Sequence, residues 1–342
     1  MSFLRWWPLP LGVWLVSWRL TGRFLRYAAA RRLLDVPNAR SSHVVPTPRG
    51  GGMAIVVTTL PALVLLGALG ALGWNFVWGL LGAGAVVAGV GFVDDHGHVA
   101  PRWRLIWHFA AAAWVLGWLG RPPPLPLPGV ALDLGWAGAG LAALYLAWLV
   151  NLTNFMDGID GIAGVEAVTI GLGGALAAAA AGTAGGQWLP PSILAAASLG
   201  FLIWNWPPAK VFMGDAGSGF LGLMLGALSL QAARAAPRLI WSWLILLGVF
   251  VVDATMTLGR RMARGERCSE AHRNHAYQHA AQRWGAHRPV TLAVAAINLC
   301  WLLPLALLVA HGSLEGVLGV LMAYAPLVAA ALLLRAGLPP GE

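Results

Sequence analysis

Residues 51–95 read GGMAIVVTTLPALVLLGALGALGWNFVWGLLGAGAVVAGVGFVDD. The first 43 of these residues carry no charged side chain. A membrane helix needs roughly 20 apolar residues, so this length is enough for two crossings. Gly70–Trp74, in the middle, supplies the small residues of a turn. We therefore predict a helical hairpin that returns to the membrane face it left and ends at two adjacent acids, Asp94 and Asp95.

Four further apolar intervals follow the same plan. The five intervals are 51–93, 104–150, 161–206, 217–258 and 289–335, each 42 to 47 residues long. Their midpoint turns are Gly70–Trp74, Arg121–Asp133, Ala181–Pro191, Ala232–Arg238 and His311–Glu315. A leading span, Trp6–Ser17, and five hairpins predict about eleven transmembrane helices. The expected fold is all-α, a polytopic integral membrane protein with a single domain over residues 1–342.

Composition and charge exclude several classes of protein. Of the 342 residues, 58% are hydrophobic and 10% charged, whereas a soluble domain has about 25% charged residues. The net charge of +9, from 22 basic and 13 acidic residues, would suggest nucleic acid in a soluble protein; here it fits the excess of basic residues in cytoplasmic loops, and we expect no nucleic-acid partner. Cys268 and Cys300 lie in different environments, which predicts two free thiols.

The hairpins bring five polar islands to one membrane face. These islands are residues 28–50, 94–103, 151–160, 207–216 and 259–288. By the predicted topology this face carries seventeen of the 22 basic residues and the opposite face four, with Arg19 inside the first span. Because basic residues gather in cytoplasmic loops, the island face is expected to be cytoplasmic, with a periplasmic N-terminus and a cytoplasmic C-terminus.

Asp94 and Asp95 are the first candidates for chemistry. Carboxylates beside the hydrocarbon are costly and mark functional sites by default. Two adjacent anions need a divalent cation, an arginine or a shared proton. Arg102 and Arg104 are candidate partners, or candidate clamps for a phosphate. The alternative is that the two acids only end a helix in water.

Two Gly-broken stretches add hard oxygen ligands. Asn151–Gly164 follows an apolar span with amides and carboxylates, and Val211–Gly219 places Asp215 before small residues that open the next helix. Amide and carboxylate oxygens suit Mg²⁺, or Mn²⁺ as an alternative, better than zinc. The other interpretation of Asp215 is a helix N-cap.

The first and last islands are basic. Residues 260–288 hold seven arginines together with His272, His275, His279 and His287. A basic loop over carboxylates and a metal suits a diphosphate, and the histidine spacing gives only half of a zinc site. Asp35–Gly52 is a loop that ends in a Gly-rich helix start, where consecutive amides could hold an anion.

In this combination and order the islands resemble the polyprenyl-phosphate N-acetylhexosamine-1-phosphate transferase family, which includes phospho-N-acetylmuramoyl-pentapeptide transferase. The matching stretches are Asp35–Gly52, Gly91–Asp95, Asn151–Gly164, Val211–Gly219 and Arg260–Gln278. The second to fourth are the more specific. The resemblance implies ten or eleven spans and a cytoplasmic active site in the bacterial inner membrane, which agrees with the count from spacing.

The resemblance also implies a reaction. Undecaprenyl phosphate attacks the sugar-bearing phosphorus of a UDP-N-acetylhexosamine and UMP leaves. By the family motifs, Asp94 and Asp95 are the catalytic acids, and Asn154 and Asp215 are Mg²⁺ ligands. The implied substrate-binding residues are Arg40, His43, Arg102, Asp157, Asp160, Arg267, His272 and His275. Asp157 and Asp160 correspond to positions near the uridine, Arg102 to a contact of the lipid phosphate, and His275 to the sugar diphosphate. The partners are these two substrates and the lipid bilayer; a homodimer stays open.

One departure from the family pattern bears on the donor. The last motif reads His275-Ala276-Tyr277-Gln278 instead of clustered histidines, and His272 stands where other members often have Asp. This favours the O-antigen-initiating branch, with UDP-GlcNAc or a 6-deoxy donor such as UDP-N-acetylfucosamine or UDP-N-acetylquinovosamine. The alternatives are the muramoyl-pentapeptide transferase, an ion-coupled transporter and an intramembrane aspartyl protease. Whether an Asp attacks first or only orients the lipid phosphate stays open.

Overall fold

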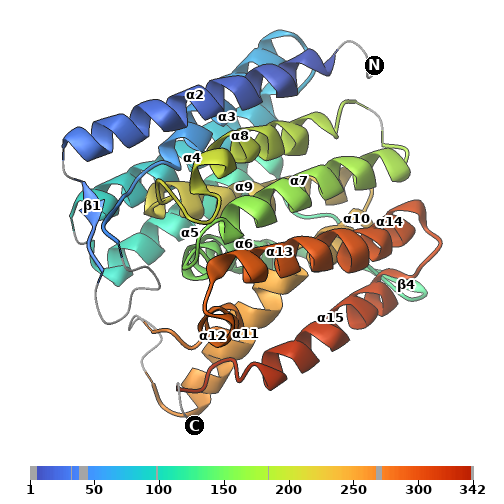
Figure 1. Cartoon of the computed structure of the whole chain (residues 1–342). Helices are drawn as coiled ribbons and strands as arrows, with labels where there is room; N and C mark the ends of the chain where they lie inside the picture. Colours follow the sequence, from blue (N-terminus) through green and yellow to red (C-terminus); the bar gives the residue numbers. More distant parts are fainter. Residues whose placement is uncertain are drawn as a thin grey trace.

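The protein is seen in a computed structural model that describes residues 6–31, 33–37, 45–97, 99–183, 185–266 and 272–339. Helices make up most of it (Figure 1). In chain order the elements are α2 (Pro8–Ala30), β1 (Leu34–Asp35), β2 (Thr47–Pro48), α3 (Met53–Ala68), α4 (Trp74–His96), α5 (Pro101–Leu119), β3 (Leu125–Leu127), β4 (Val130–Leu132), α6 (Gly135–Met156), α7 (Ile162–Ala180), α8 (Leu189–Asn205), α9 (Asp215–Ala235), α10 (Leu239–Leu246), α11 (Gly248–Ala263), α12 (Ala276–Trp284), α13 (His287–Ile297), the π-helix η1 (Asn298–Leu302), α14 (Leu303–His311) and α15 (Gly316–Leu333).

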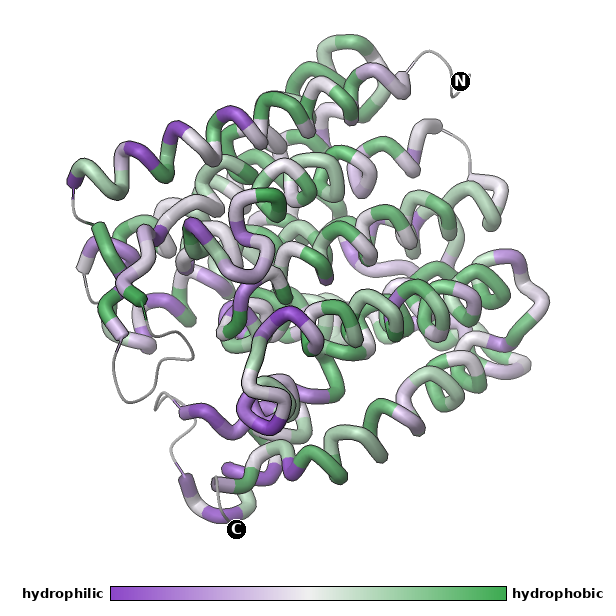
Figure 2. Tube along the Cα trace, viewed as in Figure 1, coloured by the Kyte–Doolittle hydropathy of each residue, from purple (hydrophilic) through white to green (hydrophobic). Residues whose placement is uncertain are grey.

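The polytopic membrane class is confirmed, but the count of eleven spans is not. Within the described residues, six helical segments are long and apolar enough to cross a membrane: α4, α6, α7, α9, α13 to α14, and α15. The pair α10 and α11 makes a seventh if it is one span, although it bends by 69°. α3 and α8 are apolar but shorter. Figure 2 shows apolar residues along the helices and hydrophilic residues gathered toward their ends.

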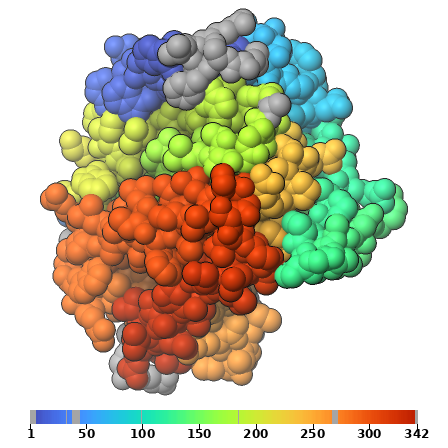
Figure 3. All heavy atoms as spheres, turned by 90° about the vertical axis from the view of Figure 1, so that its right-hand side faces the viewer, coloured from blue at the N-terminus to red at the C-terminus, as the bar shows by residue number. Residues whose placement is uncertain are grey.

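The predicted hairpin plan agrees with the way in which the midpoint turns meet. Arg238 donates hydrogen bonds to the carbonyl oxygens of Ala310 (2.7 Å) and Ala181 (3.3 Å). Arg234 donates to the Arg121 carbonyl at 2.8 Å. Four turns that lie far apart in the sequence therefore share one end of the molecule. Figure 3 shows this end, from which the segment around β3 and β4 projects.

Two small antiparallel ladders depart from the all-helical expectation. Leu34 pairs with Pro48 in the first ladder, which belongs to the polar end. Leu125 pairs with Leu132 in the second, which lies in the Pro-rich turn of the opposite end. Short loops that leave a helix can pair their free backbone groups in this way, because each unpaired polar group is costly.

The helix α9 lies at the centre of the fold. Of its apolar window, 94% is buried inside the protein, and it packs against α4 and α6. The contact with α4 is close at Gly91, where an added Cβ would lie 2.5 Å from the Ala216 amide nitrogen and from the Asp215 carbonyl. Because Gly91 lacks a side chain, the end of α4 reaches the first turn of α9.

Gly91→Ala should therefore push α4 away from α9. Overpacking of this kind costs about 1–3 kcal/mol, and we expect a lower unfolding temperature in detergent together with weaker activity. The matched control is Gly89→Ala on the same helix, where a Cβ meets nothing within 4 Å. If both variants unfold at the wild-type temperature, the close approach at Gly91 does not contribute as described.

Candidate active site

The polar end of the protein is organised around the start of α9. Gly214 precedes this helix with φ of +79°, a conformation that favours glycine, and Asp215 is the first helical residue. The carboxylate of Asp95 accepts hydrogen bonds from the backbone N–H groups of Asp215 (2.8 Å) and Ala216 (3.2 Å). An anion at a helix N-terminus is stabilised by the free N–H groups and the helix dipole. Asp95 thereby joins α4 to α9.

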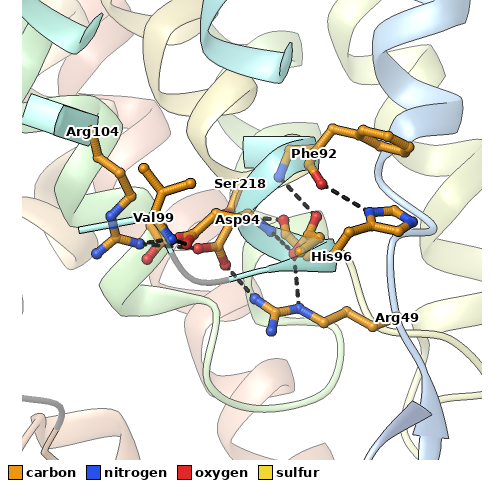
Figure 4. Close-up of polar contacts among 12 residues, drawn as sticks. Arg49, Phe92, Asp94, His96, Val99, Arg104 and Ser218 are labelled. Carbon is orange, nitrogen blue, oxygen red and sulfur yellow. Dashed lines mark hydrogen bonds and ion pairs between the residues drawn. The ribbon is translucent and has the colours of Figure 1, made fainter. Parts of the chain in front are cut away.

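Two arginines bridge the carboxylates. Arg49, from the segment before α3, contacts Asp95 Oδ1 through Nε at 2.9 Å and Asp215 Oδ1 through Nη2 at 2.5 Å. Arg104, from α5, contacts Asp94 Oδ2 at 2.5 Å and Asp215 Oδ2 at 3.2 Å through Nη1. We call these five residues the Asp–Arg cluster. Figure 4 shows Arg49 and Arg104 entering it from different sides.

The charges of the Asp–Arg cluster nearly balance. Three carboxylates face two guanidinium groups, and Asp94 also accepts a hydrogen bond from the Val99 N–H at 2.8 Å. Burial lowers the pKa of Arg49, but the carboxylates of Asp215 and Asp95 outweigh this, so its pKa lies above the ordinary value. Arg49 is therefore held as a cation whose positive charge is shared by two acids.

Arg49 and Arg104, and not Arg102, pair with the acids of the Asp–Arg cluster. The contact of Arg102 with the lipid phosphate stays a prediction. Arg102 is exposed, with its guanidinium 5.8 Å from the ring centre of Trp103, and it makes no ion pair within the described part of the chain. Arg104 was one of the two candidate partners of the paired aspartates. Arg49 was not singled out; the available signal was its position in the Gly-rich loop that could hold an anion.

A small cavity lies beside the Asp–Arg cluster. Its volume is about 20 Å³, enough for an occupant of the size of one water molecule. Its polar lining consists of Asp94, Arg104, His108, Asn151, Asn154 and Asp215. His108, which sequence reasoning missed, accepts a hydrogen bond at Nδ1 from Asn151 Nδ2 at 3.1 Å. No sequence signal distinguished this histidine from others in apolar helices.

The lining of this cavity suits a magnesium ion. In the ranges that the structure describes, no three His, Cys, Asp or Glu side chains form a complete metal cage. Mg²⁺ does not need one, because it commonly takes one or two carboxylates and completes its shell with water and substrate phosphates. Asp94, Asp215 and Asn154, whose side chains carry oxygen ligands, line the cavity, and the Asn154 amide nitrogen donates to Ser218 Oγ at 3.1 Å. The residues present therefore fit the ion.

Asp157 and Asp160 follow the C-terminus of α6. Burial raises the pKa of Asp157 well above its ordinary value, and the negative charge of Asp215 adds to this. Asp160 accepts a hydrogen bond from the Ala209 N–H at 3.0 Å, and its own N–H donates to His287 Nδ1 at 3.3 Å. The loop between α6 and α7 is thus attached to the loop between α8 and α9 and to α13.

A second, larger cavity opens next to this loop. Its volume is about 620 Å³, which is in the usual range for small-molecule sites. Polar residues on its wall are Thr47, Asp160, Arg273, Gln278, Gln282, His287 and Arg288. Thr47 and Phe212 line this cavity, and Arg49 and Asp215 of the Asp–Arg cluster follow them by two and three residues. We call it the large polar cavity.

Among the histidines of the last island, His287 lines the large polar cavity, whereas His272 and His275 line neither of the two cavities. His275 is buried and contacts Asp253 Oδ1 at 3.2 Å. His272 stacks on His275 with 5.0 Å between ring centres. Burial lowers the pKa of His272 to about 4, and the neighbouring His275 and Arg261 add to this, so His272 is neutral near pH 7. Arg40, His43 and Arg267 lie outside the described residues, and their proposed contacts with substrate stay predictions.

Comparison with known proteins supports the family that the sequence motifs resemble. Residues 77–233 match the family described as Glycosyl transferase family 4. The chain is 33% identical over 319 residues to the decaprenyl-phosphate N-acetylglucosaminephosphotransferase of Mycobacterium tuberculosis, covering 82% of this chain and 76% of the relative. The Mycobacterium leprae protein of the same name is 34% identical, covering 75% and 72%. The phospho-N-acetylmuramoyl-pentapeptide-transferase of Synechococcus elongatus is 34% identical, covering 64% and 61%.

The helical fold and the acid–arginine site at its polar end, together with these relatives, define an integral membrane transferase. The resemblance noted in the sequence is thereby confirmed. The chain belongs to the polyprenyl-phosphate N-acetylhexosamine-1-phosphate transferase family, Glycosyl transferase family 4.

Proposed function

We propose that this protein transfers an N-acetylhexosamine 1-phosphate from a UDP-sugar to undecaprenyl phosphate. An oxygen of the lipid phosphate forms a bond to the sugar-bearing phosphorus, and the bond from that phosphorus to the bridging oxygen breaks. UMP leaves with the bond electrons, and a polyprenyl diphosphosugar remains. The observation that carries the proposal is the Asp–Arg cluster, three members of which line the small cavity, while Thr47 and Phe212, close to Arg49 and Asp215 in the sequence, line the large polar cavity.

The residues of the Asp–Arg cluster have different proposed roles. Phosphoryl transfer requires positioning of the reactants and neutralisation of charge more than covalent help from the protein. Arg49 and Arg104 have the fork geometry that binds phosphate oxygens, and each already faces two carboxylates that hold it in place. Asp95 accepts two backbone N–H groups and so keeps α4 on α9. Asp94 lines the small cavity and is the acid available to deprotonate or orient the lipid phosphate.

Mg²⁺ is the proposed cofactor, with Mn²⁺ as an alternative. Asp215 and Asn154 would hold it, with Asp94 as a third oxygen donor on the same cavity wall. When bound, the ion supplies charge neutralisation at the phosphoryl oxygens. The protein residues around it supply orientation.

The large polar cavity is the proposed donor site. A volume of about 620 Å³ with two arginines, two glutamines and one acid, Asp160, on the wall suits a nucleoside diphosphate sugar. We propose UDP-GlcNAc or a 6-deoxy relative as donor, and the start of O-antigen or another envelope polysaccharide as the pathway. Muramoyl-pentapeptide phosphate transfer is the second candidate, because a phospho-N-acetylmuramoyl-pentapeptide-transferase is among the relatives.

The proposed location is the bacterial inner membrane with the cluster on the cytoplasmic side. Support comes from the basic residues: seventeen of 22 fall on the island face by the predicted topology. The corresponding proposal for the termini is a periplasmic N-terminus and a cytoplasmic C-terminus.

Release of UMP tests the function directly. Purified protein with undecaprenyl phosphate and Mg²⁺ should release UMP from at least one of UDP-GlcNAc, UDP-N-acetylfucosamine, UDP-N-acetylquinovosamine and UDP-MurNAc-pentapeptide. EDTA should reduce the rate to background, and excess Mg²⁺ or Mn²⁺ should restore it, because the oxygen ligands of the small cavity bind hard cations.

Two results would count against these assignments. UMP release that continues undiminished in EDTA would exclude a required divalent cation. Absence of UMP with all four donors, from protein that remains folded in detergent, would contradict the proposed transferase reaction.

A further inference from the structure

Asp253 is a buried acid that the mechanism above does not use. It lies in α11, in the second half of the bent pair of helices, and is 6% exposed. Its Oδ1 accepts hydrogen bonds from Thr257 Oγ1 (3.0 Å), His275 Nδ1 (3.2 Å) and the Ala276 N–H (2.9 Å). Its Oδ2 accepts one from the Tyr277 N–H at 3.0 Å. A carboxylate with four donors is a built site rather than a stray acid in an apolar helix.

The donors show what this carboxylate holds. Ala276 and Tyr277 are the first two residues of α12, and their N–H groups have no partner within that helix. A negative charge at a helix N-terminus satisfies these groups and is favoured by the helix dipole. Asp253 therefore fastens the start of α12 to α11, across the basic loop that separates the two helices in sequence.

The helix α12 in turn contacts the loop after α6 and lines the large polar cavity. Tyr277 Oη donates to the Phe155 carbonyl at 3.0 Å, two residues before Asp157. Gln278, one residue further along α12, lines the large polar cavity together with Gln282. The His275 N–H also donates to Gln278 Oε1 at 3.2 Å. The start of α12 thus links the Asp253 carboxylate, the loop after α6 and the cavity wall.

We propose that Asp253 is a positioning residue for the donor substrate: it fixes the start of α12, and through α12 it sets the wall of the large polar cavity. Asp253 itself lines none of the cavities described above. This inference rests on the proposed function, because it treats the large polar cavity as the donor site. It assigns to Asp253 an effect on donor affinity and not on the chemical step.

The charge and the two oxygens both matter. Asparagine at this position would keep one acceptor oxygen and turn an NH₂ group toward donors that need an acceptor. At least one N–H at the start of α12 would then stay unpaired in a buried place. Glutamate would keep both oxygens but is one methylene longer, so it should restore part of the effect.

Steady-state kinetics provide the first test. For Asp253→Asn we expect the KM for the UDP-sugar to rise at least tenfold, with the KM for undecaprenyl phosphate and kcat within about threefold of wild type. Asp253→Glu should recover part of the donor KM. The matched control is Glu166→Gln, the corresponding change at another buried acid; Glu166 Oε2 accepts a hydrogen bond from Asn298 Nδ2 at 2.7 Å, and no hydrogen bond of Glu166 among the described residues reaches α12. Its donor KM should stay within twofold of wild type.

A double-mutant cycle tests whether Asp253 affects the donor KM through α12. Tyr277→Phe removes the hydrogen bond to Phe155 and should raise the donor KM about threefold on its own. In the Asp253→Asn background the same change should add less than twofold, because the start of α12 is already released. Full additivity of the two effects would overturn the proposed route through α12, as would an unchanged donor KM in either single variant.

Hydrogen exchange measures the attachment of α12 to Asp253 without any substrate. The amides of α12 should exchange at least tenfold faster in Asp253→Asn, while those of α9 keep their wild-type rates. Unchanged protection of α12 would overturn the anchor. If the wild type releases no UMP from any donor, the proposed function fails, and the exchange result still decides whether Asp253 anchors α12. If Asp253→Asn does not fold, the donor KM of Tyr277→Phe decides.

Discussion

Asp215→Asn is expected to lower the rate of UMP release by about 10³-fold or more. Asp215 is the only one of the three acids of the Asp–Arg cluster that contacts both Arg49 and Arg104. It also lines the small cavity at the first turn of α9. The change removes a proposed metal ligand and leaves two guanidinium groups facing two carboxylates. The divalent cation would then bind more weakly, and each arginine would lose one of the two acids that orient it. UMP release at saturating substrates measures the loss.

The control for this variant is Asp133→Asn at the opposite end of the protein. Asp133 accepts a hydrogen bond from the Gly135 N–H in a loop and contacts no member of the cluster. It should keep its activity within twofold. Both variants should remain in the membrane fraction at wild-type amounts. An Asp215→Asn protein that retains a tenth or more of the wild-type rate would refute a central role for this carboxylate.

Arg104→Lys is expected to lower the same rate about 100-fold. One nitrogen of the guanidinium group reaches both Asp94 and Asp215, and the remaining N–H groups can serve a phosphate. Lysine keeps the charge but has a compact ammonium group on a flexible stem, so it cannot hold two carboxylates and a phosphate in one plane. The pair of acids would then repel each other more strongly, and Asp94 would lose its orientation.

Arg102→Lys is the matched control, because it makes the same substitution two residues earlier on the same helix. Arg102 is exposed and packs over Trp103, so its rate should stay within twofold. The ratio of the two variants compares Arg104, which pairs with the acids of the cluster, with Arg102, to which the family resemblance assigns the lipid phosphate. If Arg102→Lys lost more activity than Arg104→Lys, the lipid phosphate would meet the protein at the exposed face of α5, and the cluster described here would not be the contact.

The membrane architecture was predictable because it depends on local properties of the chain. Apolar intervals of 42 to 47 residues, each with a turn rich in Gly, Pro or polar residues near its midpoint, follow directly from the sequence, and a bilayer allows few other solutions for them. The contacts of Arg234 and Arg238 with other turns agree with that plan. The number of spans was less certain, since α3 and α8 are short and the pair α10 and α11 is bent.

The individual contacts of the site were harder to predict. Each helical residue rotates the side-chain direction by about 100°, so Arg102 and Arg104 point to nearly opposite sides of α5. The tryptophans of α5, Trp103, Trp107, Trp114 and Trp118, share one face of the helix, and that face is exposed. An apolar face of a membrane helix can meet lipid or protein, so the apolar pattern of α5 does not tell which face is buried. Arg49 contacts Asp215, 166 positions away, and no local pattern predicts a contact across such a distance.

The sequence alone determined the membrane class, the gathering of polar islands on one face, and the carboxylates that are candidates for catalysis. It could do so because hydrophobic length and the cost of charge near lipid are properties of the chain itself. The tertiary structure decided which arginine meets which acid, where the two cavities lie, and that Asp253 holds the start of α12. These features depend on the close packing of α4 on α9 and of α12 on α11. Such packing joins groups far apart in the chain, and only the folded arrangement of the helices determines it.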